Sequence, residues 1–211
     1  MDEKVDILKP PLFIPSGQVK TRKQAYSDGD WIGTFNLWVV TRSPEPAIIY
    51  QQRGPDMAWA PNKLDVTAGG HLQAGERLTD GLREVEEELG KHYDPSQLLK
   101  LGRKLYVGYN NDGSSHNNII DLYLIEDGSL LNTYIQQKEE VYALCACPVS
   151  ELLRVNQDEA YSFTAAGLTA EGKPINITVG KQSFPENWDD YHYKMAILVD
   201  RYFKGDKNLL Y

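Results

Sequence analysis

The segment from Gly70 to Gly90 constrains this chain more than any other. Within it, Glu84, Glu87 and Glu88 stand at positions i, i+3 and i+4. An α-helix has about 3.6 residues per turn, so these carboxylates would lie within roughly 100° of one another on one face. Like charges placed in this way destabilise an isolated helix. Because Mg²⁺ and Mn²⁺ prefer carboxylate oxygen ligands, the segment predicts a helix whose acidic face holds a divalent cation.

The opposite face of the same helix is apolar. Leu82, Val85 and Leu89 occupy that side of the helical wheel and form a stripe that would dock on a core. Gly90 follows the last apolar residue, in the place where a glycine commonly ends a helix. The sequence therefore predicts a short helix with one core face and one metal-facing face.

Length and charge limit the classes of protein. The chain has 211 residues, enough for one well-buried domain, and a net charge of −8. This charge argues against general binding to nucleic acid or anionic membranes, although bound cations would still admit a phosphorylated substrate. The acidic, proline-broken start MDEKVDILKPP is unlike a signal peptide, and no apolar run approaches the ~20 residues of a membrane span. Cys145 and Cys147 are too few for a disulfide framework, so a cytoplasmic location is expected.

The order of the predicted elements is typical of a layered α/β domain. Strands are expected at 35–41, 47–51, 64–68, 97–107, 119–125 and 141–147. Beyond the acidic helix, the patterns predict helices at about 151–155 and 188–204 and a hairpin within 163–184.

The segment from Gly70 to Gly90 resembles a Nudix box, whose pattern is G-x5-E-x7-R-E-U-x-E-E-x-G-U with U aliphatic. There are two departures: six residues rather than seven separate Glu76 from Arg83, and Lys91 stands at the closing aliphatic position. The missing residue precedes Arg83, so the spacing of the helix itself is intact. The matching positions are Gly70, Glu76, Arg83, Glu84, Val85, Glu87, Glu88 and Gly90.

The resemblance implies a Nudix-type α/β/α sandwich around a mixed β-sheet. It covers about residues 30–155, with an N-terminal elaboration at 1–29 and a C-terminal elaboration at 156–211 packed on the same domain. It implies that Mg²⁺, with Mn²⁺ as an alternative, is held by Glu84, Glu87, Glu88 and Gly70, and that Arg83 orients these carboxylates.

Residues outside the box are weighed against ordinary structural roles. Glu140, just before a strand, matches a further carboxylate that many Nudix hydrolases use as a ligand or base, but a surface glutamate is an equal alternative. Arg53 could fork onto a substrate phosphate, although an exposed arginine is the default interpretation. His71 is expected to make a structural hydrogen bond rather than to bind metal, and Cys145 and Cys147 are expected to be buried.

Three functions remain to be compared. The first is a Mg²⁺-dependent hydrolase that cleaves a diphosphate linkage in a nucleoside diphosphate derivative or related small molecule, with a homodimer left open. The second is an isomerase, because LDVTAGGHLQAGE resembles a segment of isopentenyl diphosphate isomerases; those enzymes use a cysteine where this chain has Gly69. The third is a non-catalytic binding module, but such relatives lose glutamates of the box and this chain keeps them.

Overall fold

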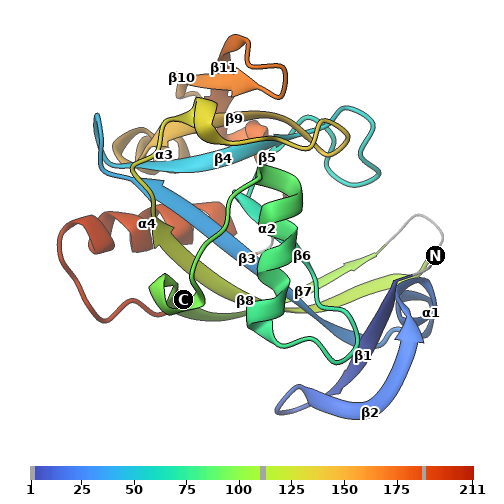
Figure 1. Cartoon of the computed structure of the whole chain (residues 1–211). Helices are drawn as coiled ribbons and strands as arrows, with labels where there is room; N and C mark the ends of the chain where they lie inside the picture. Colours follow the sequence, from blue (N-terminus) through green and yellow to red (C-terminus); the bar gives the residue numbers. More distant parts are fainter. Residues whose placement is uncertain (1–2, 110–112, 187–188) are drawn as a thin grey trace.

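Strand β3 (Trp31–Thr41) lies at the centre of the structure (Figure 1). A computed structural model of the chain describes residues 3–109, 113–186 and 189–211. Strand β3 runs parallel to β8 (Ser115–Glu126), with partners from Trp31 opposite Asn117 to Val40 opposite Glu126. It runs antiparallel to β4 and β6, so the sheet is mixed, as predicted.

The other strands extend this sheet outward on both sides. In spatial order the main path is β11-β10-β9-β4-β3-β1-β2, with β5 on β4, β6 on β3, and β7 on β8. Their bounds are β1 Lys4–Lys9, β2 Ile14–Thr21, β4 Ala47–Arg53, β5 Leu64–Asp65, β6 Ala68–His71, β7 Leu99–Tyr109, β9 Val141–Pro148, β10 Ser162–Thr169 and β11 Pro174–Gly180.

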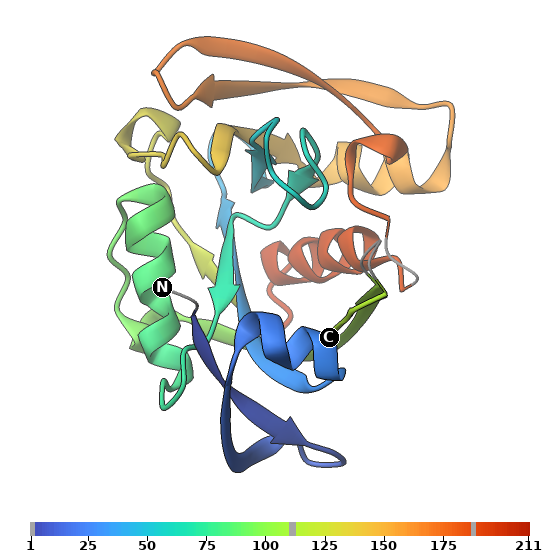
Figure 2. The ribbon, with the colours of Figure 1, turned by 90° about the vertical axis from the view of Figure 1, so that its right-hand side faces the viewer.

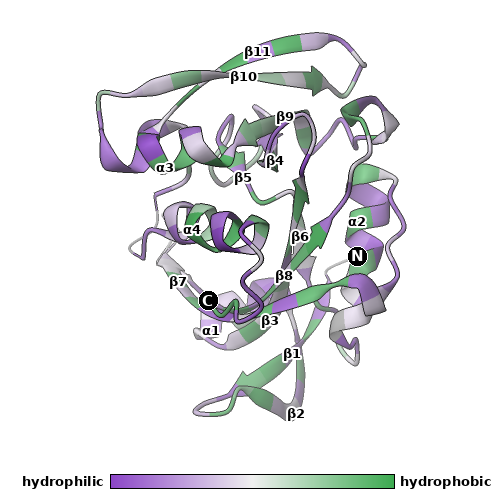
Figure 3. Ribbon diagram, turned by 90° about the vertical axis from the view of Figure 1, so that its left-hand side faces the viewer, coloured by the Kyte–Doolittle hydropathy of each residue, from purple (hydrophilic) through white to green (hydrophobic). Residues whose placement is uncertain are grey.

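Helices cover both faces of the central strands. Helix α2 (Leu82–Leu89) and helix α4 (Tyr191–Phe203) lie on opposite sides of β3 and β6 in Figure 2, and Figure 3 shows the same arrangement from the other direction. Helix α1 (Arg22–Asp28) follows the first hairpin, and helix α3 (Val149–Gln157) follows β9. The predicted α/β/α sandwich is confirmed.

Alternation along β3 explains the two layers. Phe35, Leu37 and Val39 are buried in one cluster with the apolar stripe of α2. Trp38 and Val40 point the other way and are buried in a second cluster with residues of α3 and α4. Successive side chains of a strand point to opposite faces, so a strand that is apolar on both faces must be covered on both.

Several element boundaries differ from the sequence prediction. The helix expected at about 151–155 is longer, because it begins at Val149 directly after Pro148. The strand expected at 97–107 spans Leu99–Tyr109, after a single turn at Pro95–Gln97. The last helix begins at Tyr191, and its predicted start at residue 188 lies outside the described residues. Within the described residues, no helix is long and apolar enough to cross a bilayer.

A buried histidine in α4 gives the core a dependence on pH. His192 is 5% exposed, and neither of its ring nitrogens has a hydrogen-bond partner among the described residues. Its ring stacks on Phe184 at 4.9 Å between centroids and lies near Trp38 and Tyr50. Burial lowers the pKa of His192 from 6.5 to about 3, with Lys104 acting in the same direction and Asp189 opposing it. The imidazole is therefore neutral in the folded protein.

This burial predicts a loss of stability in acid that His192→Phe should reduce. Between the unfolded pKa and the lower folded pKa the unfolded chain binds the extra proton, so stability falls as the pH falls. From pH 7 to pH 5 the His192 contribution is a loss of about 2 kcal/mol. Urea denaturation at both pH values gives the loss in free energy of unfolding for the wild type and for His192→Phe. The contributions of the other titrating groups cancel when the two losses are subtracted. Equal losses in the two proteins would show that His192 does not cause the effect.

Candidate functional site

The acidic helix forms as predicted and is fixed by two glycines. Strand β6 ends at His71, and a single-turn helix, Leu78–Gly81, leads into α2. Gly81 directly precedes α2, at a point where an added Cβ would stand 2.8 Å from the ring of Phe35. Gly90 ends it in the left-handed conformation, with φ of 60°, and its N–H donates to the carbonyl of Glu86. The close approach at Gly81 holds the helix near β3, and the left-handed conformation at Gly90 ends it.

Arg83 connects the start of the box with the acidic face. Its Nε donates to Glu76 Oε1 at 2.8 Å, and its Nη1 donates to Glu84 and lies 3.8 Å from Glu87 Oε2. Its Nη2 also reaches the carbonyl of His71 at 3.4 Å. These bonds, with Glu76 first, raise the pKa of Arg83. The spacing that is one residue short therefore still brings Glu76 to Arg83.

Glu84 lies directly against the backbone of Gly70. A Cβ built at Gly70 would stand 2.5 Å from Glu84 Cγ and 2.7 Å from Cδ, so no larger residue fits there without movement. Burial raises the pKa of Glu84, while the adjacent Arg83 lowers it. The structure thus places Gly70 and Glu84 side by side, as the resemblance implies.

Glu88 is the most deeply buried carboxylate of the helix. Its residue is 5% exposed, and its Oε2 has no hydrogen-bond partner within the described part of the chain. Burial raises the pKa of Glu88 well above its ordinary value, and the charges of Glu140 and Glu84 add to this rise, whereas Arg53 opposes it. Such a carboxylate is costly to ionise unless a cation compensates it.

Two residues outside the box, Glu140 and Arg53, lie near Glu88. Glu140 is exposed, and its carbonyl accepts a hydrogen bond from the Gly54 N–H at 2.7 Å, directly after Arg53 in β4. Arg53 pairs with Val141 in the sheet, so strands β4 and β9 bring both residues to one edge. The side chain of Arg53 is only 15% exposed. It is therefore not an ordinary exposed surface arginine, which was the default expectation from the sequence.

The three box carboxylates are not gathered around one point. Glu84 bonds to Arg83, the side chain of Glu87 is 60% exposed, and Glu88 faces inward. Within residues 3–109, 113–186 and 189–211, no three His, Cys, Asp or Glu side chains converge closely enough to hold an ion. The donor chemistry nevertheless fits a hard cation, because the unpartnered carboxylate oxygen of Glu88 is a hard donor.

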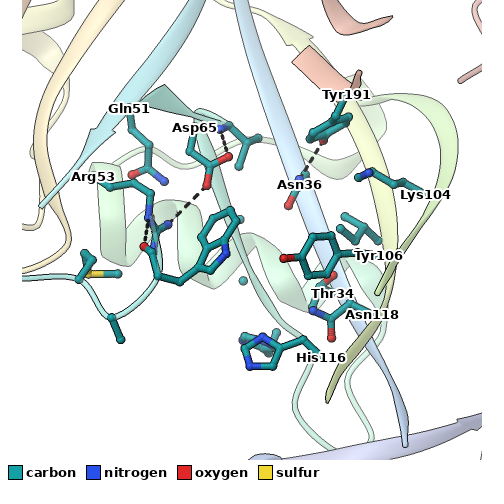
Figure 4. Close-up of a pocket in the computed structure, with 18 of the residues that line it drawn as sticks. Thr34, Asn36, Gln51, Arg53, Asp65, Lys104, Tyr106, His116, Asn118 and Tyr191 are labelled. Carbon is teal, nitrogen blue, oxygen red and sulfur yellow. Dashed lines mark hydrogen bonds and ion pairs between the residues drawn. The ribbon is translucent and has the colours of Figure 1, made fainter. Parts of the chain in front are cut away.

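A cavity of about 360 Å³ adjoins the box at Gly69 and Gly70. Figure 4 shows its walls: Arg53, Gln51 and Asp65 lie on one side, with Tyr106, Asn118, Thr34 and His116 on the other. Arg53 donates to the Trp59 carbonyl at 3.0 Å, lies 3.5 Å from Asp65, and stands 5.1 Å over the Trp59 ring. A polar pocket therefore begins where the acidic helix meets the sheet.

Most of the polar lining was not predicted. Thr34 and Asn36 come from β3, Lys104 from β7 and Asn118 from β8, while Asp65 ends β5. The sequence carries a signal for them, since Thr34 and Asn36 are polar residues at alternate positions of an otherwise apolar strand. The sequence does not show that β3 pairs with β8, and this pairing is what brings Thr34 and Asn36 near Asn118.

The other predicted structural residues are confirmed. His71 makes hydrogen bonds through both ring nitrogens, to Arg22 and to Tyr26, and burial lowers its pKa to about 3. Cys145 and Cys147 are buried, and their sulfur atoms lie 3.7 Å apart.

Comparison with known proteins identifies the family. A model of the NUDIX domain matches residues 34–166, which is more than half of the chain. The chain belongs to the Nudix family. An uncharacterised Nudix hydrolase of Clostridium acetobutylicum is 30% identical over 192 residues, covering 87% of this chain and 91% of that protein. Nudix hydrolase 3 of Arabidopsis thaliana is 30% identical over 167 residues, which span 77% of this chain but only 22% of the plant protein.

Solved structures show the same fold. A crystal structure of a Deinococcus radiodurans protein has a TM-score of 0.56 and 19% identity, covering 74% of this chain and 89% of that one. A MutT protein from Methanosarcina mazei has a TM-score of 0.54 and 14% identity, covering 82% and 96%. Members of the Nudix family generally use divalent cations such as Mg²⁺.

Residues on both sides of the matched segment line the cavity of this Nudix protein. Arg22 and Tyr26 come from α1, before residue 34, and Tyr191 comes from α4, after residue 166. Tyr191 accepts hydrogen bonds from Asn36 and Trp38, both at 2.9 Å. The Nudix domain boundaries expected from the sequence, 30–155, stay a prediction. Cavity-lining residues nevertheless lie on both sides of that range.

The close contact at Gly81 predicts that Gly81→Ala destabilises the protein. The backbone of Gly81, with φ of −60°, suits alanine, which alone would stabilise by about 1 kcal/mol. The new methyl would stand 2.8 Å from the fully buried ring of Phe35, and overpacking of this kind costs about 1–3 kcal/mol. We expect the second effect to exceed the first in urea denaturation. Gly128→Ala is the matched control, because no described atom lies within 4 Å of its added Cβ; equal stability of the two variants would contradict this packing.

Proposed function

We propose that this protein is a Mg²⁺-dependent Nudix hydrolase that cleaves a diphosphate linkage in a nucleoside diphosphate derivative or a related small molecule. The observation that carries the proposal is the buried oxygen of Glu88, which lacks a partner in the described residues. It stands on the same helix as Glu84, which touches Gly70, and Gly70 borders the polar cavity. The proposed cation ligands therefore adjoin a polar cavity of about 360 Å³.

Each site residue receives a role in this proposal. Glu84, Glu87, Glu88 and Gly70 would hold Mg²⁺, or Mn²⁺, and Arg83 would keep the carboxylates oriented through its bonds to Glu76 and Glu84. When bound, the cation supplies charge neutralisation at the diphosphate and lowers the pKa of a bound water.

Two further residues complete the site that we propose. Glu140 would accept a proton from water as a general base; its exposure and the action of its charge on Glu88 support this role. Arg53 lines the cavity and presents a guanidinium suited to a phosphate oxygen.

An isomerase is less well supported. Isopentenyl diphosphate isomerases use a thiol at the position of Gly69. A Cβ at Gly69 would stand 2.7 Å from Asn36 Oδ1 and 2.8 Å from the carbonyl of Phe35, so this chain has no space for a cysteine there without movement of the backbone. Cys145 and Cys147 are buried in the core. A non-catalytic module is less well supported for another reason, because the box keeps all its glutamates.

The location and assembly of the protein are further proposals. A cytoplasmic enzyme without nucleic-acid or membrane partners agrees with the net charge of −8. A homodimer is a separate question that size-exclusion chromatography with light scattering answers.

Replacing Glu88 should remove both metal binding and turnover. We expect Mg²⁺ to raise the melting temperature of the wild type, since a ligand that binds only the folded state stabilises it. Glu88→Gln should lose this rise and about a hundredfold in turnover of a diphosphate substrate. Glu86→Gln is the matched control, because Glu86 is on the same helix but is exposed and bonded to His92. A Glu88→Gln protein that keeps the Mg²⁺-dependent rise would show that the cation binds elsewhere.

Product analysis separates the two enzyme classes. Hydrolysis needs a cation, water and carboxylates, whereas isomerisation needs an acid and a base placed at a carbon–carbon double bond. We expect a panel of nucleoside diphosphate derivatives with Mg²⁺ to yield phosphate-containing products, and isopentenyl diphosphate to stay unisomerised by NMR. Isomer formation at an enzymatic rate, abolished in Glu84→Gln, would overturn the hydrolase proposal.

A further inference from the structure

The end of the cavity at helix α1 carries two buried polar oxygen atoms without hydrogen-bond partners among the described residues. Thr34 and Asn118 are 7% and 8% exposed and both line the cavity. Thr34 Oγ1 and Asn118 Oδ1 have no hydrogen-bond partner in the part of the chain that the structure describes. The two residues stand on adjacent parallel strands, with Thr34 opposite Ile120 and Asn118 two positions earlier on β8. Buried polar atoms are nearly always satisfied, so such a pair indicates a missing ligand or solvent.

Helix α1 closes this end through a fixed chain of hydrogen bonds. Arg22 Nη1 lies 3.0 Å from His71 Nδ1, and Tyr26 Oη lies 2.7 Å from His71 Nε2. Arginine can only donate, so Nδ1 must accept and the imidazole proton must be on Nε2, which then donates to Tyr26. Burial raises the pKa of Tyr26, and the neighbouring Arg22 and Asn118 side chains oppose this rise. Tyr26 therefore lies beside both His71 and Asn118.

The same helix supplies a flat wall to the cavity. The rings of Tyr26 and His116 are stacked, with centroids 4.1 Å apart and an angle of 6° between them. The rings of Trp59 and Tyr106, which also line the cavity, meet edge to face with centroids 6.4 Å apart. Aromatic walls with a polar floor suit a planar, hydrogen-bonding group better than a flexible hydrocarbon.

We infer that Thr34 and Asn118, with Tyr26 of α1 beside them, recognise the nucleoside part of the substrate and select it against an isoprenyl chain. A nucleoside offers a ring face to the aromatic walls and a donor and acceptor to the two unpartnered groups. A hydrocarbon would leave both groups buried and unpaired, which is the usual basis for strong rejection of an analogue that lacks a polar group. This inference rests on the proposed function only in the class of substrate, and it assigns specificity to a helix outside the segment that matches the family.

Binding of uncleavable probes tests the inference apart from turnover. The probes are α,β-methylene ADP, methylenediphosphonate without an attached group, and dimethylallyl methylenediphosphonate, each titrated calorimetrically in Mg²⁺. We expect the wild type to bind the ADP analogue most tightly. Thr34→Val and Tyr26→Phe should each weaken that binding about fivefold, the value of one hydrogen bond, and leave methylenediphosphonate unchanged.

Conservative variants and controls complete the experiment. Thr34→Ser keeps the hydroxyl and should bind the ADP analogue as the wild type does. Thr178→Val and Tyr109→Phe repeat the same changes at exposed positions, where neither probe should be affected. A selective loss in both variants supports the inference, and any other pattern overturns it, including equal losses on both probes or a wild-type preference for the isoprenyl compound. Failure of the hydrolase proposal would instead appear as absence of turnover with these binding preferences intact.

Discussion

The structure depends on strand β3 being buried on both of its faces. Its alternate residues anchor α2 on one side and α4 on the other, and its backbone pairs with β8, β4 and β6. Near its start the same alternation continues with polar residues, Thr34 and Asn36, which line the cavity, and Asn36 also donates to Tyr191 of α4. One strand thus fixes both the position of the acidic helix and the floor of the adjoining pocket.

Burial and nearby arginine charges act in opposite directions on the carboxylates where the acidic helix meets the cavity. Burial raises the pKa of Glu84 and Glu88, and it also raises the pKa of Asp65 on the cavity side. Arg83 offsets the cost at Glu84, and Arg53 offsets it at Asp65 and Glu88. The site therefore compensates its buried acidic groups with two arginines, Arg83 at Glu84 and Arg53 at Asp65 and Glu88. Removing either arginine leaves buried carboxylates without compensation, so its effect should reach beyond the phosphate contact that Arg53 is proposed to make.

The sequence predicts local features of this protein well, since the information for them is local. The acidic helix is encoded by the spacing of Glu84, Glu87 and Glu88, and its end by Gly90, so both are found where the spacing puts them. The cavity depends instead on which strands lie side by side. Nothing in the sequence near Asn118 or Tyr26 indicates that β8 pairs with β3, or that α1 folds over the same end of the sheet. Those contacts arise from long-range pairing, and for that reason the roles of the two terminal segments were not predicted.

The parallel pairing of β3 with β8 also sets the order in which the chain can fold as it is made. Trp31 pairs with Asn117 and Val40 with Glu126. Strand β3 therefore cannot complete this pairing until β8 has been synthesised, more than seventy residues later. Until then the apolar residues of β3 can be covered on the α2 side but not on the α4 side, whose helix is near the end of the chain. Parallel pairing between distant segments is slow to form and leaves apolar strands open to wrong contacts in the interval. During synthesis one apolar face of β3 is therefore open to wrong contacts until β8 and α4 have both been made.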